Sequence, residues 1–412
     1  MSGARRIVLV LICLLAPAGA DAGEMVTLDG VLHVQNPASP SGDTEVLTLK
    51  EQWRVGGDDE DVLLGIVRKA MPGKDGRLYL LDFQLSEVHV FSPAGEYLRS
   101  LSHEGDGPGE IRRPADMLFM PDGSLGLVQG FPGQIVMITL DDVPAGTLQP
   151  GGVGEGGFAN VNSAAYRGGN LVLCGGRMSG LGGDEPPREM RYLASYDTDG
   201  NERVRYVTVE RERDFSRFEY IERDHYFVND GRWALGPDGK VYAAEERDRY
   251  AIRVYAPDGS IDRIIECDIP CAKRTAGEKE EVGAEVMIVI NGEQQEMERE
   301  IEDHQPAILR MHVTSDGHLW VLSGHGDRDQ PEGIMQTYDI FDAEGHYIKR
   351  VAIACEGDPE EDLLFACDDG RYVLVKGYTQ AQEAMRAGFA APGDEEAETG
   401  EAEPLEVICY GS

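Results

Sequence analysis

A short unit of turns and strands recurs six times along this chain and constrains its fold more than any other feature. Each unit opens on Asp-Gly or Gly-Gly, a dipeptide that favours a tight turn because glycine accepts positive φ. An apolar run of strand length follows, and in several units a second strand then ends on a turn such as SPAG, APDG or DAEG. The unit needs no helix. The six turn glycines are Gly76, Gly123, Gly169, Gly239, Gly317 and Gly370.

The spacing of these glycines predicts an all-β fold, a six-bladed β-propeller. Successive glycines lie 46 to 78 residues apart, which leaves room for four short strands in every unit and for insertions in the longer ones. The last unit has only two convincing strands, 371–376 and 405–410, whereas two strand-like runs at 31–35 and 45–55 precede the first glycine. Because an open edge strand invites aggregation, we expect the N-terminal strands to complete the last blade and close the ring.

Three stretches carry a family resemblance: DGRLYLLDFQLSEVHVFSPAGEYLRSL from residue 75, EGDGPGEIRRPADM at 104–117, and GPDGKVY at 236–242. In these stretches the chain resembles exported bacterial six-bladed β-propellers related to NHL-repeat proteins. The resemblance extends from about residue 51 to residue 410 and implies a single propeller domain over 23–412. Related propellers serve as binding platforms, lactonases or lyases, so the resemblance does not select an activity.

Residues 1–22 have the pattern of a secretory signal peptide, with Arg5-Arg6, an apolar run at 7–15 and small residues before the expected cleavage site. We therefore expect an exported protein, periplasmic or secreted. No later stretch is long and apolar enough to span a membrane as a helix, so no membrane insertion is expected. The 38 basic and 75 acidic side chains give a formal charge of −37, which argues against nucleic acid and anionic membranes as partners.

Six cysteines remain after the signal peptide, an even number that permits disulfide bonds in an exported protein. Cys267 and Cys271 are close enough in sequence to close a small loop, and Cys355 and Cys367 bracket an acidic connection. A zinc site is the alternative for the first pair, although no second close pair of cysteines or histidines accompanies it. The spacing leaves both alternatives open.

The connections between blades are long and are expected to lie together on one face of the ring, where binding or catalysis would take place. The longest, 268–311, is predicted to be a partly helical insertion, because 278–289 and 293–301 lack strand alternation and are rich in helix formers. Two further long segments, 175–189 and 378–404, are predicted on the opposite face. The second of these contains GDEEAETGEAE and is predicted to be an acidic mobile loop.

Seven polar residues on the blade connections are candidates for ligand binding: Arg112, Arg113, Asn160, Asn162, Arg223, Asp224 and His225. The two adjacent arginines follow the glycine-rich stretch 104–110, which lacks the Lys-Ser or Lys-Thr of a phosphate-binding loop. In so acidic a chain, two neighbouring cations would suit an anionic ligand, and ion pairs with nearby carboxylates are the alternative. The other five residues suit ligand contacts and hydrogen bonds within their loops equally well.

His225, His304 and His325 lie in predicted loops, and their spacing provides no metal motif, so no metal ligand and no cofactor is predicted. The sequence also lacks a Gly-x-Ser-x-Gly elbow. The leading hypothesis is an exported, non-catalytic propeller that binds a small-molecule ligand or a protein partner through the face with the long connections. The alternative is a metal-dependent hydrolase or lyase, lactonase-like or amidating-lyase-like, with calcium or zinc in the central channel. A structural role in envelope assembly is a third hypothesis.

Overall fold

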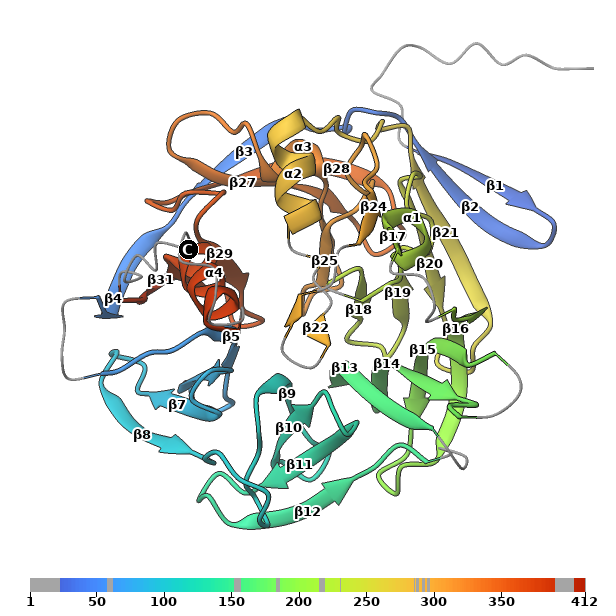
Figure 1. Ribbon diagram of the computed structural model, residues 1–412. Helices are drawn as coiled ribbons and strands as arrows, with labels where there is room; N and C mark the ends of the chain where they lie inside the picture. Colours follow the sequence, from blue (N-terminus) through green and yellow to red (C-terminus); the bar gives the residue numbers. More distant parts are fainter. Residues whose placement is uncertain are drawn as a thin grey trace, which may run out of the picture.

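The computed structural model is a ring of six β-sheets, a six-bladed β-propeller as the sequence predicts (Figure 1). The structure describes residues 23–57, 62–151, 157–182, 186–214, 219–229, 231–284, 286, 289–290, 293–294, 297–389 and 404–411. The predicted signal peptide, residues 1–22, lies outside these ranges. Within them, no helix has both the length and the apolar character needed to cross a membrane.

Five blades are built from four consecutive strands each, counted from the centre of the ring outwards. Blade 1 consists of β5 (Val67–Pro72), β6 (Leu78–Asp82), β7 (Glu87–Phe91) and β8 (Tyr97–Leu101). Blade 2 consists of β9 (Pro114–Phe119), β10 (Leu125–Gln129), β11 (Gln134–Ile138) and β12 (Pro144–Leu148). Blade 3 consists of β13 (Phe158–Arg167), β14 (Asn170–Ser179), β15 (Arg188–Tyr196) and β16 (Glu202–Glu212).

Blade 4 consists of β18 (Trp233–Leu235), β19 (Val241–Ala243), β20 (Ala251–Tyr255) and β21 (Ile261–Cys267). Blade 5 consists of β25 (Arg310–Val313), β26 (Leu319–Leu322), β27 (Ile334–Phe341) and β28 (Tyr347–Ala354), with the short α3 (Gly324–Asp327) after β26. Blade 6 takes β29 (Leu363–Ala366), β30 (Arg371–Lys376) and β31 (Glu406–Gly411) from the end of the chain, and β4 (Lys50–Gly56) from its beginning.

The ring is closed by the N-terminal part of the chain, as predicted, but only one of its strands joins the last blade. β4 pairs antiparallel with β31 and forms the outer strand of blade 6. The earlier β2 (Val31–Asn36) runs parallel to β21 on the outer edge of blade 4, and β3 (Thr44–Thr48) runs parallel to β28 on blade 5. β1 (Glu24–Leu28) pairs with β2, and this hairpin projects from the ring (Figure 1).

The six turn glycines have the conformation that the repeat predicts. Their φ angles lie between 77° and 88°, a region that side chains with a Cβ atom rarely adopt, and each glycine connects the first two strands of its blade. The values belong to Gly76, Gly123, Gly169, Gly239, Gly317 and Gly370.

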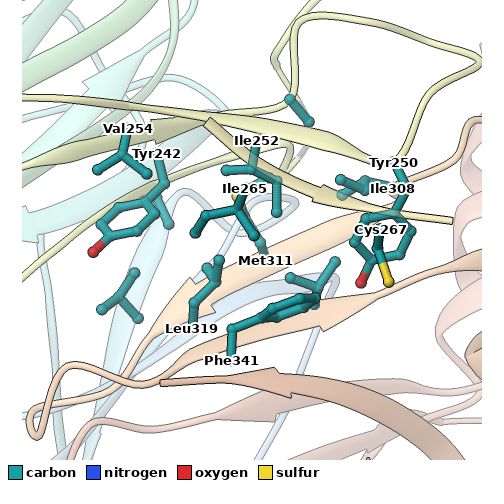
Figure 2. Packing of buried hydrophobic residues seen from close by; sticks show 14 of the residues in the cluster. Tyr242, Tyr250, Ile252, Val254, Ile265, Cys267, Ile308, Met311, Leu319 and Phe341 are labelled. Carbon is teal, nitrogen blue, oxygen red and sulfur yellow. The ribbon is translucent and has the colours of Figure 1, made fainter. Parts of the chain in front are cut away.

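Apolar side chains from neighbouring blades form the cores of the ring. Figure 2 shows the cluster between blades 4 and 5, where Ile252 and Ile265 pack with Leu319 and Phe341, and all four side chains are at most 1% exposed. Because each blade buries one face against the next, no blade forms a core alone.

The long segments lie on the same face of the ring as the blade connections, so the prediction of the opposite face was wrong. Arg191, near the start of β15, donates to the carbonyl of His225 in the connection between blades 3 and 4 (2.7 Å). Thr379, in the link between β30 and β31, donates to the carbonyl of Glu361 in the connection before blade 6 (3.0 Å). Since successive strands reverse direction, the link between the second and third strands emerges where the chain passes to the next blade. We call this the loop face.

The long connection between blades 4 and 5, residues 268–309, is a partly helical insertion. It contains α2 (Ala276–Ala284), the small hairpin of β22 (Val289–Ile290) and β23 (Glu293–Gln294), and β24 (Glu298–Glu300). The helix predicted over 293–301 is wrong, because β24 pairs in parallel with β17 (Glu219–Ile221) of the preceding connection. A tertiary strand pairing overrides the local helix preference here.

The segment 378–404 is not a loop throughout. Tyr378–Phe389 forms α4, which follows Gly377 at φ +72° and is rich in alanine and glutamine. Tyr378 and Ala381 pack against the core between blades 6 and 1, which stabilises the helix. Residues 390–403, with the acidic run, lie outside the described residues.

The six cysteines of the predicted mature chain are thiols, and no disulfide bond is formed. Cys355 packs against the core between blades 5 and 6, whereas Cys367 packs against the core between blades 6 and 1. Cys267 forms no disulfide bond with Cys271, and its thiol donates to the carbonyl of Pro37 (3.1 Å).

Candidate functional site

A cavity of about 570 Å³ lies on the loop face beside blades 3 and 4. Four regions line it: the ends of β13, β14 and β15, the connection that carries β17 and α1 (Glu222–His225), the insertion, and the link between β19 and β20, which carries Arg247. The pairing of β17 with β24 joins the second region to the third. A volume of this size is typical of small-molecule sites.

The cavity lining is basic although the chain as a whole is strongly acidic. Two glutamates, Glu189 and Glu222, lie among its described residues together with five arginines. The formal excess is three positive charges in a chain of net charge −37. The arginines are Arg177, Arg191, Arg232, Arg247 and Arg274.

Glu222 is the central acceptor of this cluster. Its carboxylate accepts hydrogen bonds from Arg247 Nη2 (2.7 Å), Arg274 Nη1 (2.6 Å) and the backbone N–H of Glu302 (2.9 Å). The two arginine side chains are only 4% and 7% exposed. Burial alone would raise the pKa of Glu222, but the hydrogen bonds from both arginines outweigh it and lower that pKa. Glu222 is therefore ionised at neutral pH and holds both arginines in place.

A second cluster surrounds Glu189 on the wall formed by blade 3. Arg191 Nε donates to Glu189 (2.7 Å), and Arg211 and Arg213 lie at 3.5 and 3.6 Å from the same carboxylate. His225 Nδ1 donates to the carbonyl of Ile221 (2.9 Å). Burial and then the nearby arginines lower the pKa of His225. Three arginines thus share one carboxylate, and the adjacent imidazole is neutral.

Several arginine N–H groups have no hydrogen-bond partner among the described residues. The side-chain hydrogen bonds of Arg274 with described residues all start from Nη1, so its Nε and Nη2 have none there. Arg191 donates to described residues from Nε and Nη1 but not from Nη2. The buried Nε of Arg247 has no partner in the described part of the chain. These N–H groups can donate hydrogen bonds to a carboxylate, phosphate or sulfonate.

Three of the seven predicted site residues line the cavity: Asn160, Asn162 and His225. Asn160 Nδ2 donates to Asn162 Oδ1 (2.7 Å), which leaves amide groups of both side chains for further contacts. The ring of His225 stacks on that of Tyr220, with the ring centres 4.5 Å apart.

The structure places the other four predicted residues outside the cavity lining. Arg112 forms exposed ion pairs with Asp106 (2.9 Å) and Glu104 (2.9 Å), which is the alternative that the sequence left open. Arg223 pairs with Glu302 (2.7 Å) and Asp248 and so ties α1 to the insertion. The remaining two are Arg113, whose backbone N–H donates to Ser86 Oγ (2.9 Å), and Asp224 in α1.

Sequence reasoning missed the charged residues that give the cavity its character. Arg177 lies near the end of β14, in the segment 175–189 that was predicted on the wrong face, and Arg191 lies in β15, two residues after that segment. Glu222 directly precedes the three predicted residues of α1, so the stretch ERDH as a whole was the available indication. Arg247 and Arg274 are remote in sequence from the predicted site residues, and their hydrogen bonds to Glu222 hold them at the cavity.

The described residues contain no group of three or more histidine, cysteine, aspartate or glutamate side chains that could hold a metal ion. Two of the three loop histidines have separate backbone partners: His325 Nε2 donates to the carbonyl of Pro270 (2.8 Å), and His225 Nδ1 donates to the carbonyl of Ile221.

No protein-family model and no curated protein matches the sequence. The structure is similar to that of a member of the DUF4221 family from Bacteroides vulgatus (11% identity, TM-score 0.47, 88% of this chain and 97% of that one). It is also similar to the calcium-binding protein regucalcin from Agrobacterium tumefaciens (12%, 0.38, 90% and 97%). A third is a catalytically inactive virginiamycin B lyase from Staphylococcus aureus, solved with quinupristin (10%, 0.37, 86% and 98%). At these values the similarities assign no ligand or activity to this chain.

Proposed function

We propose that this protein is an exported, non-catalytic binding protein that holds a small anionic molecule in the cavity beside blades 3 and 4. The observation that carries the proposal is the local excess of arginine in a chain of charge −37. The net charge repels an anion from a distance. The affinity for an anion must therefore come from short-range contacts with the arginine donors that have no partner among the described residues. The proposal of export rests on the signal-peptide pattern of residues 1–22.

The protonation states of the lining residues favour binding over acid–base catalysis. Hydrogen bonds from arginine outweigh the effect of burial and lower the pKa of both Glu189 and Glu222, so each is ionised. His225 is neutral at pH 7, and burial raises the pKa of Tyr226 to about 12. General acid catalysis by a carboxyl group at neutral pH needs a raised pKa, and among the described lining residues neither carboxylate has one. No cofactor is part of the proposal.

Replacing Arg274 by glutamine is expected to weaken the binding of inorganic pyrophosphate at least tenfold, measured by isothermal titration calorimetry. Hydrogen bonds between charged groups contribute about 1.5–3 kcal/mol each, and 1.4 kcal/mol corresponds to a factor of ten. Arg191→Gln, which changes the Glu189 cluster and not the Glu222 cluster, is the second variant, in case the loss of Arg274 disturbs the fold.

Arg112→Gln is the matched control, because Arg112 lies in an exposed ion pair outside the cavity lining and is one of the three arginines that the sequence predicted as site residues. Its pyrophosphate affinity is expected to equal that of the unchanged protein. Equal losses in Arg112→Gln and Arg274→Gln, or no saturable binding by the unchanged protein, would contradict the proposed function.

A further inference from the structure

The mouth of the cavity has an apolar side as well as basic ones. Phe158, the first residue of β13, lines the cavity and is 38% exposed. Its ring makes an edge-to-face contact with Phe131, with the ring centres 5.4 Å apart, and Phe131 is 66% exposed. Met178 is the cross-strand partner of Phe158 and also lines the cavity. We call these three residues the apolar lip.

The apolar lip exposes two aromatic rings that contact each other. Two phenylalanine rings in contact with each other and with water are costly, because each exposes apolar area that a core position would bury. The blade fold does not require them, since Phe158 is at a strand end and Phe131 lies in the link between β10 and β11. Adjacent exposed aromatic side chains beside a cavity mark a surface that binds apolar groups.

The basic and apolar sides of the cavity come from different elements. The buried arginines, Arg247 and Arg274, belong to blade 4 and the insertion and are held by Glu222 of α1. The apolar lip belongs to blades 2 and 3. The cavity has a volume of about 570 Å³, whereas a water molecule occupies about 30 Å³ of liquid. An inorganic anion, which is only a few times larger than a water molecule, would leave most of the cavity unfilled.

We propose that the ligand is an amphiphilic anion, in which one anionic headgroup contacts the arginines and an apolar body of aromatic size packs on Phe158 and Met178. This inference rests on the proposed function and specifies the chemical class of its ligand. The headgroup is a carboxylate, phosphate or sulfonate, because all three accept two hydrogen bonds from a guanidinium.

The test uses two probes with the same aromatic frame. 1-Anilinonaphthalene-8-sulfonate carries a sulfonate, and N-phenyl-1-naphthylamine is the same molecule without it. Fluorescence titration of the full chain is expected to give at least tenfold tighter binding of the sulfonate probe than of the neutral probe. Inorganic pyrophosphate is expected to displace the sulfonate probe competitively, because both use the same arginines.

Variants separate the two halves of the site. Phe158→Ser is expected to weaken the binding of the sulfonate probe about fivefold, because one face of the probe's aromatic ring loses its apolar contact with Phe158. The binding of pyrophosphate is expected to weaken less, since pyrophosphate has no apolar body. Phe131→Ser is the second variant, since Phe131 is even more exposed and its loss is tolerated more easily by the fold. Arg274→Gln is expected to weaken the binding of both the sulfonate probe and pyrophosphate. Val46→Ser, on the outer edge of blade 5 and 61% exposed, is the control for unspecific probe binding.

The outcomes distinguish the inference from the function on which it rests. If pyrophosphate binding depends on Arg274 but the phenylalanine variants weaken the sulfonate probe no more than Val46→Ser does, the ligand is a simple anion and the inference is wrong. If neither ligand depends on Arg274, the proposed function itself fails. Equal affinity for the neutral and the sulfonate probe would also overturn the inference, since the arginines would then contribute nothing to the binding of an aromatic ligand.

Discussion

Replacing Trp53 by alanine is expected to lower the free energy of unfolding by about 3–4 kcal/mol, as for other large aromatic residues in cores. Trp53 lies in β4, the N-terminal strand that completes blade 6, and is 8% exposed. Its ring stacks on Phe91 of blade 1, with the ring centres 5.6 Å apart. Its Nε1 has no hydrogen-bond partner in the described part of the chain, so the loss is one of apolar packing at the closure of the ring. Urea unfolding measures it.

Val46→Ser is the control for this prediction, because Val46 lies in the same N-terminal segment but on an exposed edge. Surface substitutions of this kind usually change stability by about 0.5 kcal/mol or less. If Trp53→Ala were no more destabilising than Val46→Ser, the closure of the ring by β4 would not stabilise the propeller.

Replacing Glu222 by glutamine is expected to lower the free energy of unfolding by about 3 kcal/mol. The substitution removes the negative charge between Arg247 and Arg274, and buried cations that lose their partner carry a large desolvation cost. Glu104→Gln is the matched control, since Glu104 pairs with Arg112 in an exposed position where an ion pair contributes little to stability. Similar losses in the two variants would show that Glu222 does not hold the cavity together.

The pH dependence of the free energy of unfolding tests the contribution of the Glu222 charge. The pKa of Glu222 is lowered in the folded protein, so its contribution is present above the ordinary value of 4.5 and is lost as the pH falls through the lowered pKa. The stability difference between the unchanged protein and Glu222→Gln is therefore expected to narrow on acidification below pH 4.5. A difference that stays constant from pH 7 to pH 3 would mean that the carboxylate charge plays no part.

The blades could be predicted from the sequence because each turn is specified locally. Glycine at Gly76 or Gly317 is required by a positive φ, and the apolar runs that follow are long enough for one strand. The path of the N-terminal segment could not be predicted in the same way. β2 and β3 are held by parallel pairing to strands more than 200 residues away, and Asn36 fixes this path through hydrogen bonds to Gly345 (2.9 Å) and Tyr347 (2.9 Å).

The site was less accessible from the sequence than the fold. Asn160, Asn162 and His225 were found because they lie on long connections, and the same argument also selected Arg112, which pairs with neighbouring carboxylates instead. The buried arginines occupy separate elements with no motif, and each becomes part of the site only through a tertiary contact. Arg274, for example, is placed by Glu222, a residue 52 positions earlier in the chain.

A crystal soaked in sodium selenate tests the anion site most directly, because selenium gives an anomalous signal that locates the ion without reference to the protein. We expect an anomalous peak inside the cavity, with selenate oxygens about 3 Å from the side-chain nitrogens of Arg274 and Arg191. The peak should be absent in Arg274→Gln crystals soaked in the same way. Selenate bound only at Arg112 or at other surface positions, with no peak in the cavity, would contradict the account.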